Sequence, residues 1–402
     1  MNRIRTLAAE FTFHNVGHGL FYSGRIGDFN FVYDCGSRKK GQIQSAVREF
    51  KRNILRKSNI DMLVLSHLHA DHISGLDILL DKTGVNTVFL PYLLPEERLM
   101  VALQDENPSV SLRSFWSDPL SFLYKKNVGR IILFGTNEAS PPEDVSDQYE
   151  EGRMDINRLL KDEKLESQIR DSESESVSRL LDTNKLFAKR HDRNLPIGNG
   201  WFFRFFNLHQ KDSRQQRFER CVRRTFPNED LIDIIKDKSK LEKLRTCYDM
   251  LRGEFNNTSL VIYHGPITSS LHQMNQCNTC SRISFRRTWQ SPNRLSIQLH
   301  RVIGHLLTGD VNFGNWTEIA RHYSSYLSRV DLALVPHHGS RRSWNRVALN
   351  DIVDACWVAS AGISSKPRHP NSNVCRDITN AGSDLQCANE VTEVISCGRF
   401  HT

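Results

Sequence analysis

The chain has 402 residues and carries 54 Lys and Arg against 46 Asp and Glu, a formal net charge of +8. Hydrophobic residues make up 39% and charged residues 25%, which is the balance of a soluble globular protein. No segment approaches the run of about 18 apolar residues that a membrane span requires, and residues 1–10 lack the apolar core of a secretory signal. We therefore expect a cytoplasmic protein without membrane contact, built as one large α/β domain with insertions or as two domains.

Cysteine content and charge indicate the redox state of the thiols and the class of partner. The nine cysteines are odd in number and scattered, which favours reduced thiols over a disulfide framework. The positive charge favours an anionic partner such as nucleic acid, although an excess of this size is also a common solubility feature. Charge therefore permits a nucleic-acid partner without requiring one.

The first third of the chain alternates short apolar runs with amphipathic segments. The pattern predicts β, β, α, β, α, β at residues 11–16, 29–34, 43–57, 62–66, 75–80 and 86–90. Such alternation is typical of stacked layers of sheet and helix.

Two polar regions interrupt the rest of the chain. Residues 137–200 are acid-rich with few apolar side chains, which predicts an insertion that offers a surface to a protein partner. Residues 265–296 are predicted to be a second insertion, basic and containing a Cys-x-x-Cys pair. Between them, the spacing predicts a strand over Trp201–Phe206 and a helix over Leu231–Leu251.

The last third returns to strands that end in polar turns. Two such units are His305–Asp310 and Leu332–Ser340. In layered α/β proteins, loops at strand ends carry functional groups while the sheet fixes them. We therefore expect the His and Asp residues of these turns to collect at one site.

The most informative segment packs three imidazoles and one carboxylate into six residues, His67-Leu68-His69-Ala70-Asp71-His72. His67 and His69, two residues apart at the end of an apolar strand, can project to one side. Asp71 and His72 follow on the turn. Such a set suits two divalent ions about 3.5–4 Å apart. The alternative is a histidine-rich surface loop, which leaves the His and Asp residues of the later turns unexplained.

This segment and two later turns, Thr308-Gly309-Asp310 and His337-His338-Gly339-Ser340, resemble the metallo-β-lactamase superfamily in their order. The resemblance spans most of the chain. It implies an α/β protein with the four-layer αββα metallo-β-lactamase sandwich, as a single domain with insertions over residues 10–402. Asp34 is similar to the superfamily's structural aspartate, which supports the metal loop from behind without binding metal.

Further segments are similar to the hydrolase domain of ComEC-type competence proteins, namely Asn15-Val16-Gly17-His18-Gly19, Asn256–Val261 and His369-Pro370. The resemblance implies a stand-alone relative, without the channel part of that family, of a metal-dependent nuclease that acts on single-stranded DNA. Relatives of this kind also suggest a role in bacterial antiviral defence.

The resemblance implies the metal ligands as well. It assigns His67 and His69 to a first metal ion, Asp71 and His72 to a second, and Asp310 to both as a bridge. The cofactors would be two divalent ions, Zn²⁺ or Mn²⁺. Many ComEC-type domains have aspartate where this chain has His69, and this difference favours zinc.

The last ligand comes from the His337-His338 pair. Either imidazole can bind the second metal while its neighbour donates a proton to the leaving group, and the working assignment has His338 on the metal and His337 as the catalytic acid. His369 is a further catalytic candidate. Arg341 and Arg342 are candidates for substrate binding, with a solvated edge as the equal alternative.

The first metal site lacks an obvious third histidine. Asn256 and Asn257 occupy the corresponding place, where they can contact the metal weakly or form the turn before the next strand. His264, His272 and His305 are alternative donors, although a lone histidine is more often a core or surface residue.

The chemistry expected of such a centre is hydrolysis by hydroxide generated at the metals, with Asp71 both binding metal and orienting the water. A nuclease or phosphodiesterase is favoured. The alternatives are a hydrolase of a small ester, thioester or lactam, and a metal-binding module in a larger complex.

Overall fold

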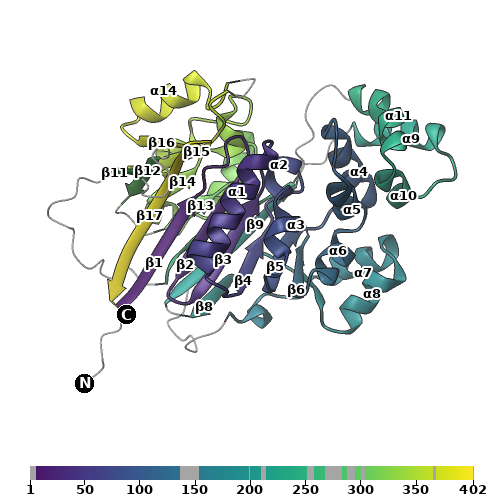
Figure 1. Cartoon of the computed structure of the whole chain (residues 1–402), viewed down its shortest axis with the longest axis horizontal. Helices are drawn as coiled ribbons and strands as arrows, with labels where there is room; N and C mark the ends of the chain where they lie inside the picture. Colours follow the sequence, from purple (N-terminus) through teal and green to yellow (C-terminus); the bar gives the residue numbers. More distant parts are fainter. Residues whose placement is uncertain are drawn as a thin grey trace.

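The computed structural model describes residues 6–135, 154–198, 200–209, 214–250, 258–267, 283–287, 295–299, 304–364 and 368–401. Two mixed sheets pack face to face, and helices cover their outer faces (Figure 1). The predicted four-layer αββα sandwich is confirmed. The boundaries of the domain and of its two insertions stay predictions.

The first sheet contains ten strands and joins the two ends of the described chain. Its strands, in spatial order, are β11 (Ile283–Arg287), β12 (Leu295–Leu299), β17 (Thr392–His401), β1 (Thr6–Phe13), β2 (Phe21–Ile26), β3 (Phe29–Cys35), β4 (Ile60–Val64), β5 (Val85–Pro91), β6 (Val128–Phe134) and β7 (Leu186–Lys189). Strands β3 to β7 run parallel, and β1 pairs antiparallel with β17, visible as purple beside yellow in Figure 1. The segment β2 was not predicted.

The second sheet contains seven strands. In spatial order they are β16 (Asp384–Ala388), β15 (Cys356–Ser360), β14 (Leu332–Leu334), β13 (His305–Leu307), β10 (Thr258–Pro266), β9 (Trp201–His209) and β8 (Asn194–Gly198). Strands β13 to β16 are parallel. Both sheets therefore have a parallel half, whose strand ends can carry functional loops on one edge.

The core between the sheets explains the unbroken aromatic run of β9. Phe203 and Phe205 point into the space between the sheets, whereas Phe202 and Phe206 face the helices on the outer side. Since successive side chains of a strand point to opposite faces, a strand buried on both sides is apolar at every position. The prediction of a strand at this run is confirmed.

The helix α1 (Lys40–Phe50) shows why the outer layers form. Its buried residues Ile43, Ala46, Val47 and Phe50 follow helical spacing and pack on the first sheet. The same side contains α2 (Ala70–Ile73), α3 (Leu76–Leu80), α4 (Pro95–Gln104), α5 (Val110–Ser117), α6 (Pro119–Lys125), α7 (Glu163–Ser172) and α8 (Glu175–Asp182). Three further helices, α9 (Gln215–Thr225), α10 (Leu231–Lys236) and α11 (Lys238–Asp249), pack beside α4 and α5 (Figure 1). The second sheet is covered by α12 (Trp316–His322), α13 (Ala348–Asp351) and α14 (Ser372–Asn380).

Two expectations about local structure need correction. The helix predicted over Leu231–Leu251 is two helices, because the Asp237 carboxylate accepts the backbone N–H groups of Ser239 and Lys240 and so caps a new start. Within the acid-rich region, residues 154–198 form α7, α8, β7 and β8, because apolar residues at helical spacing pack on the core.

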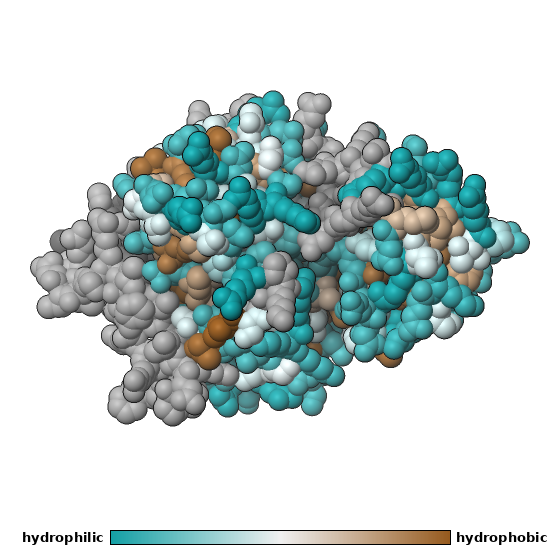
Figure 2. Space-filling model, turned by 90° about the horizontal axis from the view of Figure 1, so that it is seen from above, coloured by the Kyte–Doolittle hydropathy of each residue, from teal (hydrophilic) through white to brown (hydrophobic). Residues whose placement is uncertain are grey.

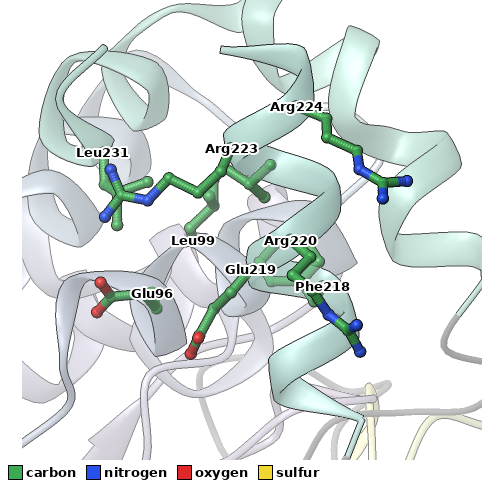
Figure 3. Close-up of a pocket in the computed structure, with 9 residues that line it drawn as sticks. Glu96, Leu99, Phe218, Glu219, Arg220, Arg223, Arg224 and Leu231 are labelled. Atoms are coloured by element: carbon green, nitrogen blue, oxygen red, sulfur yellow. The ribbon is translucent and has the colours of Figure 1, made fainter. Parts of the chain in front are cut away.

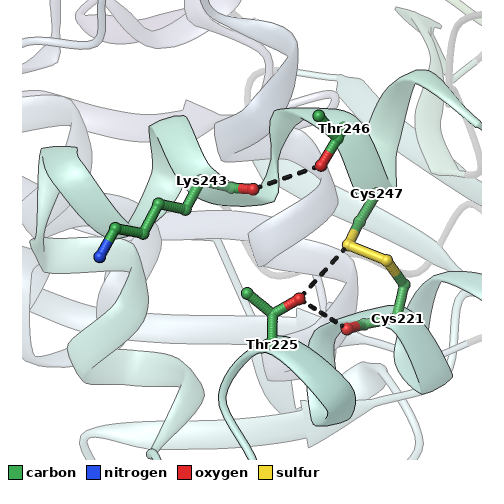
Figure 4. The surroundings of a disulfide bond; sticks show 5 residues. All are labelled: Cys221, Thr225, Lys243, Thr246 and Cys247. Carbon is green, nitrogen blue, oxygen red and sulfur yellow. Dashed lines mark hydrogen bonds between the residues drawn. A yellow bond between two sulfur atoms is a disulfide. The ribbon is translucent and has the colours of Figure 1, made fainter.

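The expectation of fully reduced thiols is wrong. Cys221 of α9 and Cys247 of α11 form a disulfide, with their Cα atoms 5.7 Å apart (Figure 4). The Thr225 hydroxyl donates to the Cys221 carbonyl at 3.0 Å beside it. An odd total of cysteines still allows one pair that the fold brings together. Among the described helices, none is long and apolar enough to cross a membrane.

Candidate metal centre

The predicted ligands lie where parallel strands end. His67 to His72 follow β4 and lead into α2, Asp310 follows β13, and His338 follows β14 in a short 3₁₀ turn, Pro336–Gly339. Because the two sheets face each other, these loops meet at one edge of the sandwich. The structure thus brings the six predicted ligands into one cluster.

Two groups of donors share Asp310. Its Oδ2 atom faces His67 Nε2 at 3.6 Å, and the first group consists of His67, His69 and Asp310. Its Oδ1 atom faces His72 Nε2 at 3.2 Å and His338 Nε2 at 3.9 Å. The two oxygens of one carboxylate therefore point into different groups, as a bridging ligand requires.

The second group consists of His72, His338 and the shared Asp310, and Asp71 joins it through His338. The Asp71 Oδ2 atom lies 3.5 Å from His338 Nε2. The contacts across both groups, at 3.2–3.9 Å, lie at or beyond the upper end of hydrogen-bond distances. They are close to the separation of about 3.4 Å between two ligands that each lie about 2.1 Å from a tetrahedral cation.

Hydrogen bonds behind the imidazoles fix their orientation. The Asp34 Oδ2 atom accepts from His72 Nδ1 at 2.8 Å and from the Ser66 hydroxyl at 2.5 Å. Since Ser66 gives its proton to Asp34, its oxygen accepts from His67 Nδ1 at 2.8 Å. The Ser360 carbonyl accepts from His338 Nδ1 at 2.7 Å. These bonds leave the Nε2 lone pairs directed at the centre.

Four inner atoms of the cluster make no hydrogen bond within the described protein. All four are buried, namely the Nε2 atoms of His67, His72 and His338 and the Oδ1 atom of Asp310. A buried polar atom left unpaired is costly, and such atoms converging from four residues fit cations as their missing partners. The His and Asp groups are consistent with a binuclear metal site.

Protonation states support the same conclusion. Burial lowers the pKa of His67 well below its usual value, so this imidazole is neutral and can donate a lone pair. Burial raises the pKa of Asp310, but the facing imidazoles outweigh it and hold that pKa well below its usual range. Burial lowers the pKa of His72, yet Asp310 and Asp34 together raise it well above normal. The carboxylates around His72 thus require positive charge.

The sequence pattern of the metallo-beta-lactamase superfamily matches residues 21–99, the part that contains Asp34 and the His67 to His72 segment. This part of the chain thus carries the sequence pattern of that superfamily, and the two packed sheets have its α/β fold. The two mixed sheets are arranged as in that superfamily's sandwich. No curated protein sequence matches the chain.

Two solved structures are similar to the chain at low sequence identity. The metallo-beta-lactamase fold protein YhfI from Bacillus subtilis is 10% identical, with a TM-score of 0.37 over 96% of this chain and 99% of that one. A long form RNase Z from yeast is 10% identical, with a TM-score of 0.27 over 81% of this chain and 32% of the yeast enzyme.

His337 and His338 lie on different sides of Asp310. His338 is buried within the second group, whereas His337 is partly buried on the side of the first group, with Nε2 3.7 Å from Asp310 Oδ2 and Nδ1 3.0 Å from the Ser343 hydroxyl. This arrangement agrees with His338 as ligand and His337 as proton donor. Both residues have left-handed backbone angles, with φ of 49° and 56°, which turn the two rings in different directions.

The other predicted residues are less central. His369 lies beside the cluster, with its ring centre 5.8 Å from that of His18, and is outside the donor groups. Arg342 lines the cleft at the site, whereas Arg341 is exposed and does not line it. Asn256 and Asn257, together with His272, lie outside the described residues.

His264 and His305 are not metal donors. Both bond the Tyr22 hydroxyl in the core between the sheets, at 3.0 Å from His264 Nε2 and 2.7 Å from His305 Nδ1. Within the described residues, no further histidine joins His67 and His69, so the first group stays at three donors.

Sequence reasoning missed two side chains at Asp71. His18 Nε2 lies 3.8 Å and Arg38 Nε 3.2 Å from Asp71 Oδ2. Both belong to loops that follow β1 and β3, the same strand edge as the metal loop. The position of these loops at a strand end was the signal that could have found them.

A cleft of about 1030 Å³ gives access to the centre. His69 and Asp71 line it. Its lining also includes three cationic residues, Arg38, Lys40 and Arg342, and three acidic ones, Asp105, Glu106 and Asp249. Hydrophilic residues cover most of the described surface seen in Figure 2, and apolar residues form small separate patches.

A second pocket, of about 410 Å³, lies between α4 and the arginine-rich helix α9. Figure 3 shows Arg220, Arg223 and Arg224 extending from α9, with Glu96 on the facing helix. Its lining contains no histidine and shares no residue with the metal cluster. The cleft above His69 is therefore the candidate substrate site.

Proposed function

We propose that this protein is a metal-dependent hydrolase that cleaves phosphodiester bonds in nucleic acid, with single-stranded DNA as the favoured substrate. The main observation behind this proposal is that the two carboxylate oxygens of Asp310 face separate groups of donors. Two divalent ions held this way, Zn²⁺ or Mn²⁺, would lower the pKa of water and draw charge from a phosphoryl oxygen. We also propose that the chain is a relative of ComEC-type hydrolase domains and acts in genome defence.

The residues around the centre have separable tasks. Asp71, held by its contact with His338, orients the attacking water. His337, beside Asp310, donates a proton to the leaving oxygen, and His369 is the alternative donor. Arg38 is more than half exposed, so its guanidinium can bind a phosphate while its Nε contacts Asp71.

A basic groove next to the cleft supports a polymeric anion as substrate. This groove, of about 890 Å³, shares Asp77 and Ile78 with the cleft. Five cationic residues line it, namely Arg48, Lys51, Arg52, Lys57 and Lys82. Helix α1 begins beside the cleft at Lys40 and ends at this groove. A strand leaving the centre along α1 would meet positive charge at both ends of the helix.

The acidic residues that line the cleft favour the second candidate, a hydrolase of small molecules. Asp105, Glu106 and Asp249 would repel a polyanion lying across them, but they would tolerate a small ester, thioester or lactam. A third possibility is a metal-binding module in a larger complex, with the acid-rich region as the partner surface.

The decisive experiment compares substrates and variants. With Mn²⁺ or Zn²⁺, the purified protein is expected to cleave single-stranded DNA, and Asp71→Ala and Asp310→Ala are expected to lose this activity with the fold intact by circular dichroism. Asp28→Ala, an exposed carboxylate in the β2–β3 turn, is the matched control and should cleave normally. Equal cleavage by Asp310→Ala would overturn the proposal.

The groove is tested by charge reversal. Lys57→Glu with Lys82→Glu should lower the salt slope of single-stranded DNA binding by about 1.4, at about 0.7 for each lost phosphate contact. Hydrolysis of bis(p-nitrophenyl) phosphate should not change, because the metal centre is untouched. Hydrolysis of a thioester or lactam without any cleavage of DNA would instead establish the small-molecule candidate.

A further inference from the structure

The loop Asn15–Leu20, between β1 and β2, brings a histidine against the second donor group. The Leu20 N–H donates to the Asp71 carbonyl at 3.1 Å, and the Ser360 hydroxyl donates to the Gly19 carbonyl at 2.6 Å. Ser360 is also the residue whose carbonyl holds His338. The loop is therefore bonded to the backbone of one predicted ligand, Asp71, and to Ser360, which holds another, His338.

Gly19 makes this close approach possible. Its φ angle is 148°, and a Cβ atom there would lie 2.6 Å from the Asp71 carbonyl oxygen. No side chain fits at that distance, so only glycine lets the loop lie this close to the metal loop. The approach places the adjacent His18 at the centre.

His18 completes a triangle of donor atoms. Its Nε2 atom lies 3.8 Å from Asp71 Oδ2, which in turn lies 3.5 Å from His338 Nε2. The ligand atoms of these three residues lie within 4.8 Å of one another, and all three side chains are buried. At 3.8 Å, His18 is too far from Asp71 for a hydrogen bond, but the separation suits two ligands of one cation.

No competing role for His18 is visible in the described protein. Its Nδ1 atom is buried without a hydrogen-bond partner, and its ring lies beside that of His338, with centres 4.3 Å apart. No hydrogen bond at Nδ1 assigns this imidazole another role, and its Nε2 atom faces Asp71, where a ligand atom would lie.

We infer that His18 is a further ligand of the second metal ion. The second group then has five donors, namely His18, Asp71, His72, His338 and the shared Asp310, against three in the first group. The inference rests on the metal centre of the proposed function but not on its substrate. The second ion is accordingly the more tightly held of the two, and the first ion is the more readily exchanged.

The test is a titration of metal-free protein with Co²⁺, followed by calorimetry and by the visible absorption of the bound ion. His18→Ala is expected to weaken the tighter binding event by at least about tenfold, the lower end of what outer partners of ligands contribute. It should also change the absorption of that ion, because a nitrogen ligand is lost. The weaker event should be unchanged.

Two further variants keep the outcome interpretable. His369→Ala removes a nearby imidazole outside the donor groups and should leave both events as in the wild type. His18→Cys supplies a thiolate in place of the imidazole and should retain the tighter event, whereas His18→Asn, used if His18→Ala does not fold, should not.

Several results would overturn the inference. Wild-type affinity and absorption in His18→Ala would exclude His18 as a ligand, and failure of the wild-type protein to bind Co²⁺ would exclude the centre itself. Normal metal binding without DNA cleavage would contradict only the proposed substrate.

Discussion

The two halves of the centre differ in how deeply they are held. The first group, His67, His69 and Asp310, has three donors, and His69 lines the open cleft. The second group is buried, and its imidazoles are braced by Asp34 and Ser360. One linear motif thus contributes to two donor groups that the rest of the fold supports unequally: Asp34 and Ser360 hold two imidazoles of the second group, and Ser66 holds one of the first.

The largest effect is expected for Asp310→Ala, which removes the donor common to both halves. The affinity for both ions should fall by more than about 100-fold, because removing only an outer partner of a ligand already costs about 10–100-fold. Metal content after gel filtration is the measurement. Retention of two ions would mean that the halves do not share this carboxylate.

A second prediction separates the halves through their supports. Asp34→Asn weakens the acceptor for His72 Nδ1 and should lower the affinity of the second group by about 10–100-fold. The first group should lose less affinity, because Asp34 reaches His67 only through the Ser66 hydroxyl. Calorimetric titration resolves the two events. An equal loss in both would show that Asp34 supports the whole loop rather than one half.

The pH dependence of metal affinity should also distinguish the two donor groups. His72 has a raised pKa beside Asp34 and Asp310, so in the metal-free protein it carries a proton at neutral pH that the ion must displace. Affinity of the second group should fall about tenfold per pH unit below that pKa. Burial lowers the pKa values of His67 and His69, so the first group should show little change there. Calorimetric titrations in buffers of different ionisation enthalpy count the protons released on metal binding. Proton release at the first group alone would contradict the prediction.

The smallest effect is expected for Arg38→Ala. Its guanidinium touches Asp71 from the solvent side and is more than half exposed, so metal binding should change little. The KM for DNA should rise by about tenfold, as expected for one lost charged contact of about 1.5 kcal/mol, with kcat nearly constant. A fall in kcat with unchanged KM would place Arg38 in the chemical step instead.

Much of this centre was predictable because its parts occupy strand ends. The pattern of His67 to His72 after an apolar strand, and the turns at Asp310 and His338, indicated one site before any distance was known. His18 was not predicted as part of it, because its place depends on the approach of Gly19 to Asp71, a contact between distant segments.

Other features could not be read from the sequence for similar reasons. The Cys221–Cys247 disulfide depends on how α9 and α11 pack, and cysteine counting carries no information on that. His264 and His305 looked like candidate ligands, but the sheets place them against Tyr22 in the core. Local patterns predicted the strands and the ligand types, whereas pairing across the sandwich decided which residues meet.

The most direct test of the unequal centre is a calorimetric titration of metal-free wild type and His69→Ala with Zn²⁺. The wild type should show two binding events, and His69→Ala should lose the weaker one while the tighter one remains. Loss of the tighter event in His69→Ala, or two equal events in the wild type, would contradict the account.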